Sequence, residues 1–190
     1  MTAFREDFEN QMNQGNFSGA NAVLLDMQKA DSKSQIFLES QGRYLVRRRD
    51  YTLAREALKQ CLTAFPKSKS CLVDLASTEL QIGTKEEQAE AIRQCLSVVP
   101  NDPQCRNMSG INLINSGNYN EAIKVYEELL KDNGNYGFRF DNGMLNWQMA
   151  LALDGVGRSD EALEHFEQSC RQSFSEACKK LEELSGGAFE

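Results

Sequence analysis

The sequence repeats itself with a period of 34 residues. Pro66 and Pro100 lie 34 positions apart, and a cysteine stands five positions before each proline. Gly15, Gly83 and Gly117 fall on the same spacing. A repeat of this length is one small structural unit that cannot bury its apolar face alone, so neighbouring units must stack. The period therefore predicts a chain made of stacked copies of one motif.

Five repeats align, and within each repeat a position is numbered from its first residue. Position eight is mostly small, as at Gly42 and Gly110, while position twenty-four is bulky, as at Leu58 and Tyr126. Position fifteen is glycine in four of the five repeats, which predicts a turn with a left-handed backbone. Small and bulky positions at helical spacing predict two closely packed helices per repeat. No segment alternates with period two, so we expect an all-α fold.

The repeat resembles the tetratricopeptide repeat (TPR). The fourth repeat carries the resemblance most clearly, with small residues at Gly110 and Ala122 and aromatic residues at Tyr119 and Tyr126. The resemblance implies a right-handed α-solenoid of five TPR-like helix-turn-helix repeats followed by a capping helix at 175–185. We expect one domain, 1–190, with repeats at about 1–34, 35–68, 69–102, 103–142 and 143–174.

The expected helices follow from the same register. A polar-backed helix is expected after the last repeat, because a stack of repeats needs a solvated end. The expected pairs are 2–14 with 18–30, 35–48 with 51–64, 69–82 with 86–98, 103–116 with 119–131, and 143–156 with 159–171.

The six cysteines fall into pairs in this register. Cys61 and Cys95 occupy position twenty-seven, and Cys71 and Cys105 occupy position three of the following repeat. These positions should face each other where two repeats meet. The remaining two cysteines would link the last repeat to the capping helix. The predicted disulfides are Cys61–Cys71, Cys95–Cys105 and Cys170–Cys178.

Two other states of the cysteines are weighed against disulfides. Reduced, buried cysteines would act as small apolar side chains. A zinc site is disfavoured, because there is no CxxC motif and His165 is the single histidine. The pairs also resemble those of secreted bacterial repeat proteins related to the TPR, which implies an oxidising compartment.

Composition and motifs exclude several functions. The net charge of -7 offers no basic surface for nucleic acid, and no apolar run is long enough to span a membrane. No nucleophile with a base, paired acids in a cleft, metal cluster or glycine-rich phosphate loop is recognisable. We therefore expect no enzyme activity, no cofactor and no metal.

The resemblance also implies a binding groove, because the first helix of each TPR pair lines the concave face. An apolar floor edged by amides and arginines would suit an extended or helical peptide. The alternative is that the position-twelve residues pack between repeats and do not contact a ligand. The candidate groove residues are Arg43, Val46, Arg47, Ser77, Leu80, Gln81, Asn107, Ile111, Ile114, Asn115 and Trp147.

Charge is distributed unevenly along the chain. Residues 1–66 carry nine basic and eight acidic side chains, whereas residues 67–190 carry 12 and 20. Arg43 and Arg47 lie one helical turn apart, so an acidic segment is one option for the partner. A solvated basic face is the other explanation. The carboxylate clamp of chaperone-binding TPRs is absent, because Glu9 and Arg43 stand where that clamp has asparagine.

An insertion at 132–142 interrupts the period and contains three aromatic residues. Insertions in solenoids often gather on the binding face. Tyr136, Phe138 and Phe140 would form a partner-binding loop if exposed, or ordinary core if tucked under the fourth and fifth repeats.

Together these features predict a non-catalytic scaffold that binds a protein or peptide, in the periplasm or outside a bacterial cell, with the signal peptide absent from this sequence. A pilotin-like assembly factor for a secretin or type IV pilus is one alternative. A cytoplasmic TPR adaptor with reduced cysteines, in a motility or signalling complex, is another. The sequence leaves open the partner, the oligomeric state, the lipidation of the N-terminus and the organism.

Overall fold

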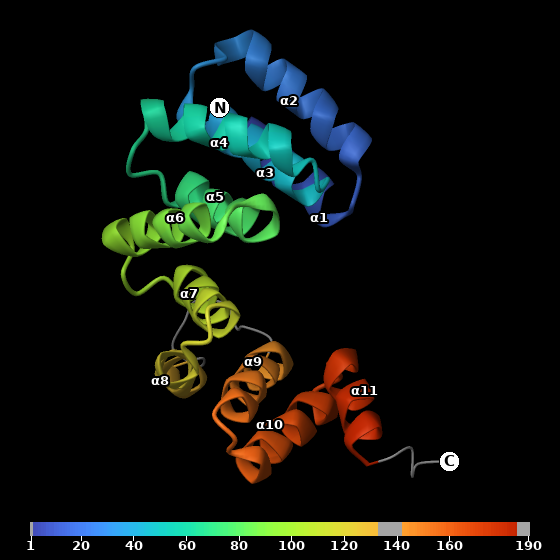
Figure 1. Cartoon of the computed structure of the whole chain (residues 1–190). Coiled ribbons are helices and arrows are strands. Elements are labelled where there is room, and N and C mark those ends of the chain that lie inside the picture. Colours follow the sequence, from blue (N-terminus) through green and yellow to red (C-terminus); the bar gives the residue numbers. More distant parts are fainter. Residues whose placement is uncertain (1, 133–141, 186–190) are drawn as a thin grey trace. The chain divides into compact units, whose positions relative to one another are not determined.

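The computed structural model describes residues 2–132 and 142–185, which form eleven α-helices and no strand (Figure 1). Every expected helix is present with both ends within one residue of its expected position, so the all-α prediction is confirmed. The helices are α1 (Thr2–Asn13), α2 (Phe17–Asp31), α3 (Gln35–Arg47), α4 (Tyr51–Ala64), α5 (Lys69–Ile82), α6 (Lys85–Val98), α7 (Pro103–Asn115), α8 (Tyr119–Asp132), α9 (Asn142–Gly155), α10 (Ser159–Arg171) and α11 (Ser175–Leu184).

Polar side chains fix the start of several helices. The Ser34 side chain accepts a hydrogen bond from the backbone N–H of Phe37 at the start of α3. Asp102 caps α7 and precedes a proline at the first helical position. Thr84 and Glu87 form a reciprocal capping box at the start of α6. Each cap satisfies backbone N–H groups that have no partner inside the helix.

The turn inside each helix pair has a left-handed residue at position fifteen in four of the five repeats. Gly15, Gly117 and Gly157 have φ of 69°, 76° and 77°, and Arg49 adopts the same conformation with φ of 63°. The prediction is wrong at Gly83, whose φ is -80°. The reason is the shorter α5–α6 turn, which has two residues where the other turns have three.

The chain divides into two compact units, and each is described by itself. The first unit is Met1–Pro100 and contains α1 to α6. Within it α1 packs on α3, and α3 packs on α5, so these three helices form an inner layer. Helices α2, α4 and α6 pack against this layer from their own repeats. Phe8, Met27 and Phe37 are among the buried side chains at the α1–α3 end.

Small residues at position eight allow the two helices of a repeat to approach closely. A Cβ atom added to Gly42 would lie 2.4 Å from Cδ2 of Leu58. One added to Gly110 would lie 2.5 Å from Cζ of Tyr126. In both repeats the small position eight therefore faces the bulky position twenty-four, and no larger side chain fits at position eight unless its neighbour moves.

The second unit, Asn101–Glu190, contains α7 to α11. Its core includes the fully buried Tyr126, Leu129 and Leu145, together with Phe166 from α10. Helix α11 packs against α10, and Leu181 of α11 contacts this core. The predicted capping helix is therefore present.

Candidate protein-binding site

The inner layer of the first unit carries the candidate groove residues from α3 and α5. Val46 and Leu80 are half-buried, so each keeps part of its apolar surface open to solvent. Ser77 is also half-buried, and Arg47 and Gln81 are exposed. A row of partly exposed apolar side chains with polar neighbours can accept another polypeptide segment.

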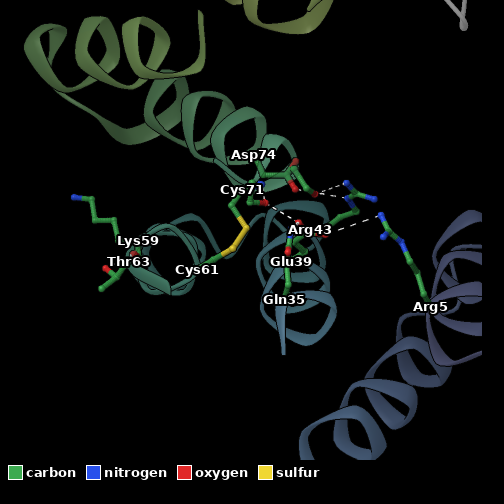
Figure 2. The surroundings of a disulfide bond; sticks show 11 residues. Arg5, Gln35, Glu39, Arg43, Lys59, Cys61, Thr63, Cys71 and Asp74 are labelled. Carbon is green, nitrogen blue, oxygen red and sulfur yellow. Dashed lines mark hydrogen bonds and ion pairs between the residues drawn. A yellow bond between two sulfur atoms is a disulfide. The ribbon is translucent and has the colours of Figure 1, made fainter. Parts of the chain in front are cut away.

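Arg43 of α3 is held by side chains of the other two inner helices, α1 and α5. Its guanidinium donates to Oε1 of Glu9 at 2.7 Å and to Oγ of Ser70 at 2.7 Å. Its Nε atom lies 3.6 Å from Oδ2 of Asp74 (Figure 2). The charge of Arg43 is therefore compensated inside the protein.

Burial raises the pKa of Asp74 to about 6, and the positive charge of Arg43 opposes this shift in part. The nearby carboxylates of Glu9 and Glu39 raise the pKa further. Oδ2 of Asp74 is buried without a hydrogen-bond partner among the described residues. Asp74 therefore carries its charge at neutral pH in an unfavourable environment.

Glu39 is a buried acidic residue of the same layer. It is 9% exposed and accepts hydrogen bonds from Gln35 at 2.7 Å and from Oγ of Ser68 at 2.6 Å. Arg5 lies 4.0 Å away (Figure 2). Because Ser68 also caps α5, Glu39 connects α3 to the start of the next repeat.

The candidate groove residues of the second unit range from buried to exposed. Asn107 is 7% exposed, and its Oδ1 atom has no hydrogen-bond partner among the described residues. Ile111 and Ile114 are half-buried, and Asn115 is exposed. The Trp147 ring packs against Phe166 and Phe174 with centroid distances of 5.3 and 5.8 Å, so part of its surface serves the core.

The predicted partner loop belongs to the part of the chain that the structure does not describe. Tyr136, Phe138 and Phe140 lie outside the described residues.

The cysteines are oxidised at the repeat boundaries. Cys61–Cys71 joins α4 to α5 and is fully buried (Figure 2). Cys170–Cys178 joins α10 to α11 and is half-buried. Cys95 and Cys105 are also disulfide-bonded, and no described cysteine is free. A disulfide that closes so short a loop adds at most about 3 kcal/mol by the chain-entropy estimate.

The described residues contain neither a metal-binding cluster nor a helix suited to cross a membrane. They contain no group of three or more His, Cys, Asp or Glu side chains arranged to bind a metal ion. No helix within the described ranges has the length and apolar character of a membrane span. His165 Nδ1 lies 2.8 Å from Oδ1 of Asn146, and burial lowers its pKa.

Sequence comparison identifies the repeat. Tetratricopeptide repeat profiles match residues 9–69, 39–104 and 103–133. The chain belongs to the tetratricopeptide repeat family. TPR proteins bind other proteins, so the family supports a protein-interaction scaffold as the general role of this chain. No curated protein sequence matches the chain significantly.

Solved structures of MamA share the fold. One MamA structure aligns with a TM-score of 0.67 at 20% identity and covers 93% of each chain. MamA from AMB-1 gives 0.68 at 22% identity, over 90% of this chain and 97% of that one. A double mutant of MamA from RS-1 gives 0.69 at 14% identity, over 92% and 95%. At these identities the similarity shows the TPR α-solenoid fold alone.

The inner-layer ion pairs were not predicted from the sequence. A signal for them was present, because positions five and nine carry Arg5 and Glu9 in the first repeat but Glu39 and Arg43 in the second. This reversal of sign places opposite charges side by side when α1 packs on α3.

Proposed function

We propose that this protein is a non-catalytic scaffold whose inner layer, formed by α1, α3 and α5, binds a segment of another protein. The observation that carries the proposal is the partly exposed side-chain row of Val46, Ser77, Leu80 and Gln81 on packed first helices of TPR repeats. The aliphatic side chains supply apolar contact, while Ser77 and Gln81 can bond a partner's backbone.

The ion pairs around Arg43 make this layer rigid. Glu9 of α1 and Ser70 of α5 both accept hydrogen bonds from Arg43 of α3, so these bonds hold the three helices in one arrangement before a partner arrives. Pre-organisation reduces the entropy lost on binding. In the second unit Ile111, Ile114 and Asn115 would contact a partner in the same way, with Asn107 and Trp147 supporting them.

The first experiment maps the partner-facing side. A photo-crosslinking amino acid is placed at Gln81, and, as a control, at Leu53 on α4, which is 56% exposed. A partner that uses the inner layer cross-links in an extract of the source cells from position 81 and not from position 53. Equal cross-linking from both positions would contradict the proposal.

The second experiment measures the contact directly. The segment identified by cross-linking is synthesised, and its affinity is measured by calorimetry. Leu80→Gln should weaken binding about tenfold, because it removes apolar contact area, whereas Leu53→Gln should leave the affinity unchanged. Equal effects of the two matched substitutions would exclude the inner layer.

We also propose that the protein works in a non-reducing compartment such as the bacterial periplasm. The disulfides of the structure support this location, since thiols are kept reduced in most cytosols. To test this, the protein is isolated from its own cells in the presence of an alkylating reagent, and its mass is measured. A mass without alkylated cysteines is expected. Six alkylated cysteines would instead place the protein in a reducing compartment, as a cytoplasmic adaptor would be.

A further inference from the structure

A second polar surface lies in the first unit where the start of α2 meets the end of α3. It is a pocket of about 500 Å³. Phe17, Ser18 and Asn21 from the first turns of α2 form one side. Tyr44 and the three consecutive arginines at 47–49, from the end of α3 and the following turn, form the other. We call this surface the arginine pocket.

The arginine pocket has an excess of positive charge. Arg48 is compensated, because its Nε lies 3.2 Å from Oδ2 of Asp50 and its guanidinium lies over the Tyr44 ring. Arg47 and Arg49 are exposed and make no ion pair or side-chain hydrogen bond with the described residues. The first turn of α2 contains no acidic residue, and a helix N-terminus adds positive potential. Two guanidinium groups are therefore available for an anionic ligand.

The backbone at Arg49 is unusual for its position in the repeat. Three other repeats place glycine in the same left-handed turn, at Gly15, Gly117 and Gly157. An arginine in this conformation is strained, because its Cβ crowds the backbone. Residues held in strained conformations are enriched at ligand-binding and active sites. Ser173, in the turn before α11, is the other described non-glycine residue with a positive φ, 67°. Glycine would satisfy the turn, so the fold does not explain the arginine.

An aromatic surface adjoins the charges. Phe17 is 38% exposed, and its ring meets Tyr44 edge-on at a centroid distance of 6.3 Å. A free inorganic anion would make no use of this apolar area. A peptide with carboxylates beside an apolar side chain would contact both the arginines and the ring.

From these observations we propose that the arginine pocket binds an acidic segment of a protein partner, with Arg47 and Arg49 pairing its carboxylates and Phe17 contacting an adjacent apolar side chain. The inference rests on the proposed scaffold function and adds a contact at the place where Arg47, at the end of α3, meets the first turns of α2. It also assigns recognition of acidic residues to Arg47 and Arg49, whereas Arg43 is neutralised by Glu9 and Asp74.

The test uses a synthetic peptide of alternating Asp and Glu that ends in Phe, titrated into the isotope-labelled protein and followed by NMR. Backbone amide shifts should concentrate at residues 17–21 and 44–50. An otherwise identical peptide of Asn and Gln should not bind. Absence of binding by the acidic peptide, or shifts located elsewhere, would overturn the proposal.

Three variants separate charge recognition from folding. Arg47→Gln and Arg49→Gly should each weaken binding about tenfold. Arg49→Gly is decisive, because it relieves the strained backbone, so that loss of binding cannot come from unfolding. Arg93→Gln removes an exposed arginine on α6 and should leave affinity unchanged. Unchanged affinity in both pocket variants would refute the assignment.

Inorganic phosphate and phosphatidylserine vesicles are titrated in parallel. If either produces the same shifts at an affinity equal to that of the peptide, the pocket is a general anion site and the proposal fails. This failure differs from failure of the proposed function. If the proposed function fails, no partner cross-links at Gln81, whatever the pocket binds.

Discussion

Replacing Asp74 by asparagine should raise the stability of the first unit at neutral pH. The Asp74 side chain is 17% exposed and faces Arg43 together with the carboxylates of Glu9 and Glu39. Burial is the largest cause that raises its pKa, from an ordinary 3.8 to about 6. At pH 7 the folded protein holds an ionised carboxylate in a place that favours the neutral form.

The magnitude follows from this pKa difference. Between about pH 4 and pH 6 the folded protein keeps a proton on Asp74 that the unfolded chain has released. The stability contributed by this group is therefore complete below about pH 4 and is lost as the pH rises to about 6. At about 1.4 kcal/mol per pKa unit, the loss is about 3 kcal/mol. Asparagine does not titrate, so the advantage of Asp74→Asn should grow by about this amount from pH 4 to pH 7.

The assay is urea unfolding at several pH values, followed by far-ultraviolet circular dichroism. Circular dichroism is used because Trp147, the single tryptophan, lies in the second unit. Asp26→Asn on the exposed face of α2 is the matched control, and its curve should parallel that of the unmodified protein. If the Asp74→Asn curve is also parallel from pH 4 to pH 7, the account of Asp74 is wrong.

Three further changes have expected outcomes. Gly110→Ala should lower the free energy of unfolding of the second unit by about 1–3 kcal/mol, because its Cβ would meet Tyr126; Trp147 fluorescence in urea measures this, and an unchanged midpoint would refute it. Arg49→Gly should raise the free energy of unfolding by about 1 kcal/mol, because it removes the strain of a left-handed arginine. Thermal unfolding measures this, with Arg49→Lys as the control that keeps the strained backbone; equal stability of the two variants would contradict the prediction. Increasing dithiothreitol should reduce the half-buried Cys170–Cys178 before the fully buried Cys61–Cys71, as alkylation and peptide mass spectrometry can show; reduction of both together would contradict this order.

The helices could be predicted from the sequence because their determinants are local. Repeat period, small residues at position eight and polar caps each act within one repeat, and they locate every helix end to within one residue. The prediction of a left-handed turn was wrong only at Gly83, because glycine permits this conformation without requiring it. The two-residue length of the α5–α6 turn determines the backbone conformation at Gly83.

The site was less predictable because its side chains pair across repeats. Position in the register places Arg43 on the inner layer, but it does not show whether the guanidinium meets solvent or Glu9 and Asp74. Trp147 has the same difficulty, because its packing depends on Phe174 in the turn before α11. Such contacts depend on side-chain geometry between segments that are distant in sequence.

The Cys61–Cys71 bond also determines where the first unit can fray. It ties the second repeat to the third, so those repeats cannot separate while the bond is intact. The first repeat meets the second through apolar packing that includes Met27 and Phe37 and through the Glu9–Arg43 ion pair, without a covalent link. Transient opening should therefore begin between α2 and α3, and hydrogen exchange should be faster in α1 and α2 than in the cross-linked pair of repeats.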